Sequence, residues 1–172
     1  MHIIKFYNLA DHRTRNSPIL GVSSNKLTSL PQSFGKLTKL WDIFIVDNQF
    51  TSIPQCIINL PNLINLIFDD NKITSLPENI GNLHRLEHLG LGDNQLTSLP
   101  ESIGDLVHLR QFWLGHNQLQ NLPQSFKRLT LLEGSDINIT LEHPNVEVND
   151  TLTSEESNDI DIFLNNNFFG ND

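Results

Sequence analysis

Few side chains in this sequence have the type and spacing needed for catalysis or metal binding. Cys56 is the one cysteine, and its thiol would act as a nucleophile only beside a base, but no histidine or other base is placed to activate it. His84 and His88 are four residues apart, the spacing by which two histidines on one helix bind zinc. The sequence has no glycine-rich phosphate loop and no G-x-S-x-G nucleophile motif. It therefore predicts no catalytic residue, and the element carrying the two histidines decides whether they can bind a metal.

An internal repeat of 23 residues defines the elements that carry these side chains. Asparagine recurs at positions 25, 48, 71, 94 and 117, and each copy is followed two residues later by an apolar side chain and six later by proline. The copy from Leu86 to Leu106 fits the pattern LxxLxLxxNxLxxLPxxIGxL at every position. This pattern resembles the leucine-rich repeat, in the 23-residue form typical of intracellular, Ras-group-like members. The resemblance extends from Ser17 to Ile139.

The resemblance implies an α/β leucine-rich-repeat solenoid with a concave parallel β-sheet, convex turns and short 3-10 or helical segments. Apolar residues at alternating strand positions give each coil one apolar side, which only a neighbouring coil can cover. The repeat places His84 on a turn and His88 on a strand, so helical metal-ligand geometry does not apply and no metal site is expected. Cys56 falls on an outer turn that carries serine or asparagine in the other copies.

The sequence divides into three parts. Residues 1–16 are expected to form an N-terminal cap or a degenerate half repeat, and residues 17–139 hold the repeats with their five ladder asparagines. Residues 140–172 form an acidic C-terminal cap or tail, in which the capping box starting at Thr153 predicts a short helix. Three roles stay open for this tail: a cap on the last coil, a docking peptide, or a translocation signal.

Charge is distributed unevenly along the chain. Residues 1–132 hold all eleven Lys and Arg against ten Asp and Glu, whereas the segment from Glu133 onward has ten acids and no base. The net charge of -9 argues against nucleic acid or an anionic membrane surface as a partner. No stretch approaches the ~20 apolar residues of a membrane span.

Cysteine usage and the amino terminus predict a cytoplasmic protein. A single cysteine cannot form the disulfide caps usual in extracellular members of the resembled family. The first ten residues have too short an apolar stretch for a signal peptide. The acidic carboxy terminus and the high asparagine content are also typical of effectors that intracellular bacteria inject into host cells, so translocation into a host is a second possibility for the location.

Residues that vary between copies are expected to carry recognition. One outward-facing column of the concave sheet reads Gly21, Phe44, Ile67, Gly90, Trp113 and Asp136. Glycine at position 90, with Gly92 and Gly115 in the next column, leaves backbone without side chains. The sequence thus predicts an apolar slot with a bare backbone floor, walled by Ile67 and Trp113.

Polar and mostly acidic residues are expected around this slot. The preceding column holds Asp42, Asn65, His88 and Gln111, the following one Val46 and Asp69, and the rim Asp47, Asp70, Asp93 and His116. The three rim aspartates have an alternative role, because Asp also serves turns. The predicted protein-binding residues are Asp42, Phe44, Val46, Asn65, Ile67, Asp69, His88, Gly90, Gln111, Trp113 and His116.

These residues predict a non-enzymatic protein-protein interaction module that needs no cofactor. Its partner would present an apolar side chain beside a Lys or Arg, which the acidic surroundings attract. The alternative is the substrate-recognition subunit of a ubiquitin ligase or other enzyme whose catalytic part is on another chain, because the segment after the repeats is too short for a catalytic domain. A third reading, a structural spacer, predicts a concave face that binds nothing.

Overall fold

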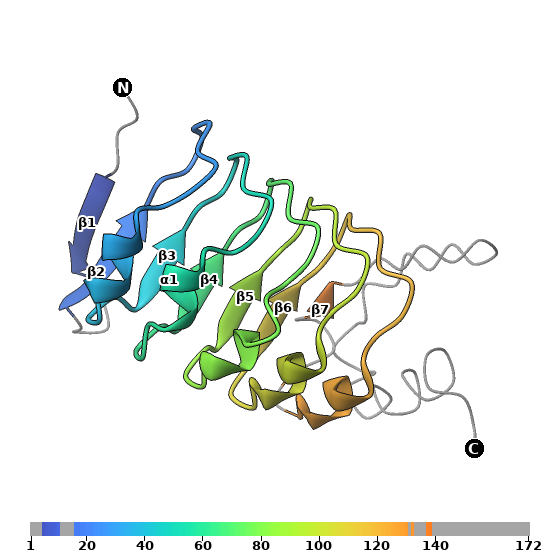
Figure 1. The fold of residues 1–172 in the computed structure, drawn as a ribbon. Coiled ribbons are helices and arrows are strands. Elements are labelled where there is room, and N and C mark those ends of the chain that lie inside the picture. The colour runs from blue at the N-terminus through green and yellow to red at the C-terminus, as the bar shows by residue number, and fades with distance from the viewer. Residues whose placement is uncertain (1–4, 11–15, 131, 133–136, 139–172) are drawn as a thin grey trace, which may run out of the picture.

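The computed structural model describes residues 5–10, 16–130, 132 and 137–138, and all statements below concern these residues. They form a series of stacked coils whose short strands make up a single sheet, as Figure 1 shows. The strands follow one another in sequence order: β1 (Lys5–Ala10), β2 (Asn16–Gly21), β3 (Asp42–Phe44), β4 (Asn65–Ile67), β5 (His88–Gly90), β6 (Gln111–Trp113) and β7 (Ile137–Asn138). The predicted tail helix from Thr153 lies outside the described residues.

The strands from β2 to β7 are parallel, as the repeat predicts. Phe44 pairs with Ile67, Ile67 with Gly90, and Gly90 with Trp113. At β7 the spacing changes, because Trp113 pairs with Asn138. The predicted column is therefore wrong at its last member: Asn138 takes the place that a constant spacing assigned to Asp136.

At the other end of the sheet, β1 runs antiparallel to β2, with Lys5 opposite Gly21 and Ala10 opposite Asn16. A further coil would add a parallel strand, so β1 does not repeat the geometry of the coils. β1 is the edge strand of the sheet, and the choice between a cap and a half repeat for residues 1–16 stays a prediction. Such a strand satisfies backbone groups of β2 that would otherwise be open.

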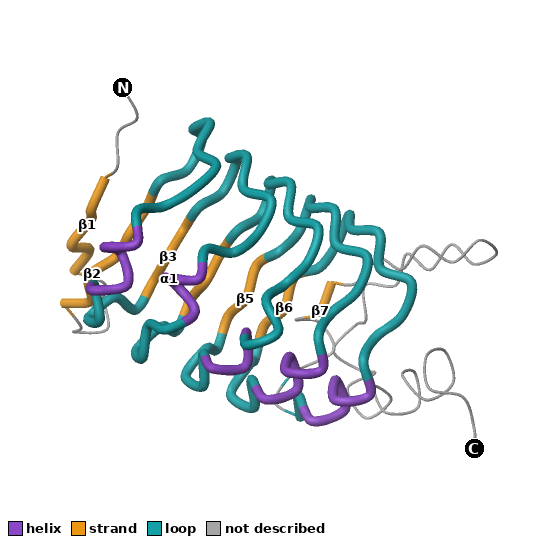
Figure 2. The backbone as a smooth tube through the Cα atoms, in the orientation of Figure 1, coloured by secondary structure: helices purple, strands orange, loops and turns teal. Residues whose placement is uncertain are grey.

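Short helical segments lie on the far side of each coil from its strand, as Figure 2 shows. They are η1 (Gln32–Lys36), α1 (Gln55–Ile58), η2 (Ile80–Asn82), η3 (Glu101–Asp105) and η4 (Gln124–Arg128). None of the helices in the described residues is long and apolar enough to cross a membrane. A Cβ added to Gly104 would lie 2.3 Å from the Ser125 carbonyl oxygen, so this glycine lets η3 and η4 approach closely. Ile58 holds the equivalent place in α1 and is buried.

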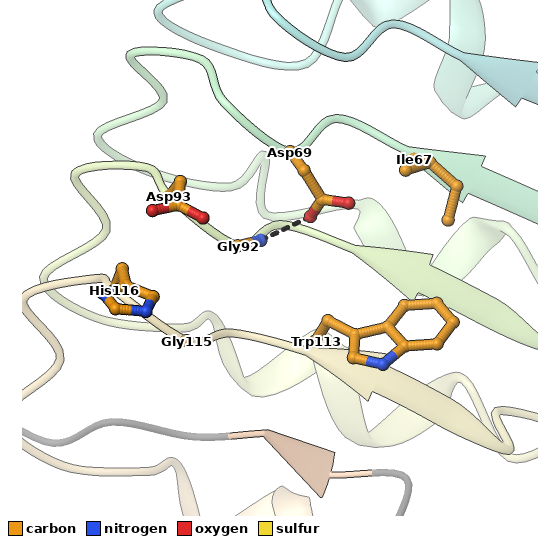
Figure 3. A pocket seen from close by; sticks show the side chains of 7 residues that line it. All are labelled: Ile67, Asp69, Gly92, Asp93, Trp113, Gly115 and His116. Atoms are coloured by element: carbon orange, nitrogen blue, oxygen red, sulfur yellow. Dashed lines mark hydrogen bonds between the residues drawn. The ribbon is translucent and has the colours of Figure 1, made fainter.

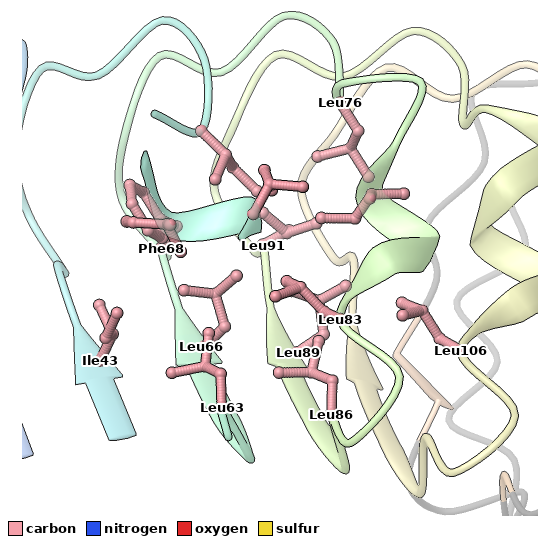
Figure 4. Packing of buried hydrophobic residues seen from close by; sticks show 14 of the residues in the cluster. Ile43, Leu63, Leu66, Phe68, Leu76, Leu83, Leu86, Leu89, Leu91 and Leu106 are labelled. Atoms are coloured by element: carbon pink, nitrogen blue, oxygen red, sulfur yellow. The ribbon is translucent and has the colours of Figure 1, made fainter. Parts of the chain in front are cut away.

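The space between sheet and helical segments is filled by one continuous apolar core. Leu66 and Leu89 of neighbouring strands are fully buried and lie side by side, as Figure 4 shows. Phe50 and Phe68 meet edge to face, with their ring centroids 5.5 Å apart. Because each buried side chain packs against the next coil, the core stabilises the stack rather than any single coil.

The ladder asparagines tie neighbouring coils together. Asn94 is 6% exposed, and its Oδ1 accepts a hydrogen bond from the backbone N–H of Ile73 in the previous coil at 2.9 Å. Its Nδ2 donates to the carbonyls of Phe68 at 3.0 Å and Leu91 at 3.1 Å. The same pattern recurs at Asn48, Asn71 and Asn117. Bonds to the carbonyls of the asparagine's own turn are also present, but those to the previous coil are the ones that join repeats.

Each turn beside the ladder contains one residue in the left-handed conformation. The φ angles lie between 51° and 56° at Ser24, Asp47, Asp70, Asp93 and His116. Asp, Asn and His adopt this conformation more readily than other non-glycine residues. The backbone N–H of Asp93 then donates to the Gly115 carbonyl of the next coil at 2.9 Å. These angles support the turn role for the three rim aspartates.

Replacing Asn94 by alanine should destabilise the chain more than replacing Asn25. Asn94→Ala leaves the buried N–H of Ile73 without its acceptor, which costs about 1–3 kcal/mol. Asn25 is only half-buried, and within the described residues its amide is hydrogen-bonded to Val22 and Ser23 of its own turn. Urea unfolding of both variants measures the difference, and equal losses of stability would show that the bonds between coils contribute nothing extra.

Candidate functional site

Two rows of side chains on the sheet and one row just after it form the candidate surface. The first row holds Asp42, Asn65, His88 and Gln111, the second Phe44, Ile67, Gly90 and Trp113, and the third Val46, Asp69, Gly92 and Gly115. The apolar side chains of the second row are half-buried rather than fully exposed. Parallel pairing with constant spacing brings each row together, as the sequence predicts.

The first row is partly bonded within itself. Asn65 Nδ2 donates to Asp42 Oδ1, whereas Asn65 Oδ1 is buried and has no hydrogen-bond partner among the described residues. The His88 ring meets the Trp113 indole edge to face, with ring centroids 6.4 Å apart and planes at 87°. This contact holds the indole in a defined orientation, so His88 acts as a support for Trp113.

An open pocket of about 440 Å³ lies over β4, β5 and β6 and the turns that follow them. Its lining consists of Ile67, Asp69, Gly92, Asp93, Trp113, Gly115 and His116. Figure 3 shows Ile67 and Trp113 at one end, Asp93 and His116 at the other, and Asp69 with Gly92 between them. The pocket therefore has an apolar end and a polar end.

Asp69 occupies the space that the glycines leave open. Its Oδ1 accepts a hydrogen bond from the backbone N–H of Gly92 at 2.6 Å. A Cβ built on Gly90 would lie 2.8 Å from Asp69 Oδ2 and 3.0 Å from Ile67 Cγ2. Any side chain at position 90 would consequently displace the carboxylate or the isoleucine. Glycine at this position is what allows Asp69 to lie over β5.

The Asp69 carboxyl is held in an environment that opposes its charge. Burial raises its pKa above the usual value, the Gly92 hydrogen bond lowers it, and the nearby charges of Asp70 and Asp93 raise it further. The net direction is upward. An elevated carboxyl pKa in a concave site is a feature of functional sites, since it reflects a charge that the fold itself disfavours.

The pocket differs from the predicted slot in one respect. The sequence predicted an apolar slot, but the Asp69 carboxylate lies over its backbone floor and makes it acidic. Ile67, Asp69, Trp113 and His116 of the predicted residues line the pocket, and so do Gly92, Asp93 and Gly115. The others lie outside this lining: Asp42, Phe44, Val46, Asn65, His88, Gly90 and Gln111. The direction of the Asp69 side chain, set by the Gly92 bond, has no signal in the repeat pattern.

Catalytic and metal chemistry have little support in the described residues. Within them, no group of three or more His, Cys, Asp or Glu could hold a metal ion. Cys56 is 5% exposed, so it lies deeper than the outer-turn position suggested. Burial raises the pKa of its thiol, although backbone hydrogen bonds partly oppose this. A thiol held in its protonated form is a poor nucleophile.

Comparison with known proteins identifies the repeat. A leucine rich repeat family model matches residues 61–119. A leucine-rich-repeat protein of Leptospira interrogans is 33% identical, with a TM-score of 0.65, over 71% of this chain and 31% of that one. The leucine-rich-repeat ectodomain of the Arabidopsis thaliana membrane receptor kinase GASSHO1/SCHENGEN3, solved in complex with CASPARIAN STRIP INTEGRITY FACTOR 2, is 30% identical with a TM-score of 0.59. That alignment covers 72% of this chain and 16% of the ectodomain.

A third similar structure is a chain of the BIR3–SERK2 complex from Arabidopsis thaliana, which is 27% identical with a TM-score of 0.60. The alignment covers 84% of this chain and 78% of the matched chain of the complex. No curated protein matches the chain. The chain spans less than a third of the length of the Leptospira protein and of the GASSHO1/SCHENGEN3 ectodomain. The family match over residues 61–119 and the similar structures show that the chain has a leucine-rich-repeat solenoid fold.

Asp69→Asn should raise stability near neutral pH. The raised pKa means that Asp69 favours the folded state when protonated. This contribution is fully present below the unfolded-state pKa and is lost as the pH rises through the raised pKa of the folded state. Asparagine removes the charge and keeps an acceptor for the Gly92 N–H. Thermal unfolding at pH 7 should show a higher melting temperature than wild type, with the gap closing in acid below the ordinary Asp pKa of about 3.9.

Asp47→Asn serves as the control for this experiment. It removes the same charge from an exposed turn residue whose φ of 55° asparagine also tolerates. Its melting temperature at pH 7 should stay close to that of the wild type. A lower melting temperature for Asp69→Asn than for wild type at pH 7 would contradict the view that the fold disfavours this charge.

Proposed function

We propose that this chain is a non-enzymatic protein-binding module whose partner binds on the concave face, over the pocket between β4 and β6. The observation that carries this proposal is that Trp113 and Ile67 line the same open pocket as two carboxylates, Asp69 and Asp93. Aromatic side chains in partly desolvated pockets are typical anchors of protein interfaces. A structural spacer has no need of such a pocket, and the proposal involves no cofactor.

The partner is expected to present a surface that is both basic and apolar. Its apolar part would contact Trp113 and Ile67, and Phe44 extends this apolar row by one coil. Its positive charge would face Asp69 and Asp93, which make the rest of the pocket acidic. Complementary charge favours the encounter and suppresses acidic partners, nucleic acid among them.

Two of the similar structures support a protein as the partner class. The GASSHO1/SCHENGEN3 ectodomain was solved with CASPARIAN STRIP INTEGRITY FACTOR 2, and the BIR3–SERK2 structure is a complex of two proteins. In the alternative function, the same face would recognise a substrate for a ubiquitin ligase or other enzyme whose catalytic part is on another chain. Co-purification of a catalytic subunit with this chain would favour that alternative.

We also propose that the protein belongs to the intracellular 23-residue LPxxIGxL type and acts in the cytoplasm, either of its own cell or, as a bacterial effector, of a host cell. The single cysteine and the fit of Leu86–Leu106 to that repeat support this. Fractionation of cells that produce the tagged chain should recover it in the cytosol. Recovery in the secreted or cell-surface fraction would contradict the cytoplasmic location.

Trp113→Ala should weaken partner binding by roughly 30-fold, because truncating an aromatic anchor often costs about 2 kcal/mol. The full chain, the Phe44→Ala/Trp113→Ala pair and Trp113→Ala are immobilised and exposed to cell extract. Proteins captured by the wild type and lost from the pair are purified, and their Kd values for wild type and Trp113→Ala are then measured.

Val107→Ala is the matched control for this capture. Val107 is an exposed apolar residue, 47% accessible, in the turn between η3 and β6 and away from the pocket. It should leave binding unchanged, and thermal unfolding of every variant separates lost binding from lost folding. A partner that binds Trp113→Ala as tightly as wild type but fails with Val107→Ala would place the site off the concave face.

A further inference from the structure

The charge of the pocket restricts what can fill it. Asp69 and Asp93 contribute two carboxylates to the lining, and none of the seven lining residues is Lys or Arg. His116 lies at the exposed polar end of the lining. A cation is therefore the complementary ligand. A metal ion is disfavoured because the described residues contain no cluster of three or more potential ligands.

The two oxygens of Asp69 have different environments. Oδ1 accepts the Gly92 N–H at 2.6 Å, and this bond fixes the orientation of the carboxylate. Oδ2 lies over Gly90, which in the sheet register stands between Ile67 and Trp113. No donor to Oδ2 is present in the described part of the chain. One hydrogen-bond acceptor with a fixed direction thus faces the apolar end of the pocket.

The indole of Trp113 is also held in place, by the edge-to-face contact with His88. Figure 3 shows the ring lying along β6, across the pocket from Ile67 and Asp69. A flat, positively charged group that is rich in N–H donors can stack on this ring and also bond Asp69. Guanidinium has these properties and contacts aromatic faces more often than an ammonium group, which is compact, more strongly hydrated and has no flat face.

The fold gives no reason of its own for a charge at position 69. Asparagine could accept the same Gly92 hydrogen bond without the desolvation that burial imposes on the carboxylate. A residue that lowers the stability of the fold and supports no structural feature is expected where function requires it. The charge of Asp69 is accounted for if a positive group of a partner covers it in the complex.

We propose that the pocket receives the guanidinium group of one arginine side chain of the protein partner, stacked on Trp113 and hydrogen-bonded to Asp69 Oδ2. This inference rests on the protein-binding function proposed above and names the group that the pocket recognises. Asp93, at the polar end, adds attraction for the same charge, and Ile67 contacts the methylene groups of the arginine side chain.

The test uses N-acetyl-arginine amide as the probe and N-acetyl-citrulline amide, its neutral and nearly isosteric analogue, as the comparison. Each is titrated into the full-length 15N-labelled chain while the Gly92 amide and the Trp113 indole N–H are followed by NMR. The arginine probe should shift both signals saturably in the millimolar range. The citrulline probe should bind at least about tenfold more weakly, because it lacks the charge that strengthens the bond to Asp69.

Two variants of equal charge complete the design. Asp69→Asn should weaken binding of the arginine probe by about tenfold or more, since it removes the charged acceptor. Asp47→Asn should leave the affinity within about twofold of wild type, because the exposed Asp47 side chain does not line the pocket and exposed charges contribute little. Comparable affinity for citrulline, an Asp69→Asn variant that binds as well as wild type, or no saturable shift would each overturn the inference.

Failure of this inference is distinguishable from failure of the proposed function. If captured partners still depend on Trp113 but the arginine probe does not bind, protein binding on the concave face stands and the arginine pocket falls. If the probe binds as expected while no partner depends on Trp113, the pocket chemistry stands and the concave-face module falls. Substituting each arginine of a captured partner in turn should identify one whose loss matches that of Asp69→Asn, and the absence of any such arginine counts against the inference.

Discussion

The structure depends on contact between successive coils, because no coil can bury its own apolar side. Leu66 and Leu89 are fully buried because each is covered by the neighbouring coil. The same dependence extends to polar groups: Asn94 satisfies the backbone of the previous coil through Ile73 and Phe68. Apolar contacts and asparagine hydrogen bonds thus join the same pairs of coils, so the stability of each coil depends on its neighbours. Both kinds of interaction require a constant repeat length.

That constancy allows the concave face to vary without cost to the fold. Positions that face outward on the sheet contribute little to the core, and here the variation takes the form of missing side chains at Gly90, Gly92 and Gly115. The opened space is occupied by the Asp69 carboxylate, whose pKa is raised first by burial. The site therefore combines a floor of bare backbone with a carboxylate charge that the free protein disfavours. A positively charged partner would stabilise this partly desolvated charge.

Much of the site could be predicted because parallel strands with a fixed period turn sequence spacing into spatial adjacency. Phe44, Ile67, Gly90 and Trp113 are neighbours in the sheet for this reason. The prediction failed at the next strand, where the offset becomes 25 residues and Asn138 replaces Asp136 beside Trp113. It failed because the ladder asparagine, which marks the register, has no copy there. The antiparallel direction of β1 likewise carried no signal, since that segment lacks the repeat.

By itself, the sequence determined the period, the α/β solenoid and most of the buried and outward positions. These follow from alternation along a strand and from the 23-residue spacing, which are local properties of the chain. Only the tertiary structure decided that Asp69 leans over Gly90 to bond Gly92, that His88 supports Trp113, and that Cys56 is buried. Each of these depends on side-chain directions set by a neighbouring coil, and such directions are fixed by packing rather than by spacing.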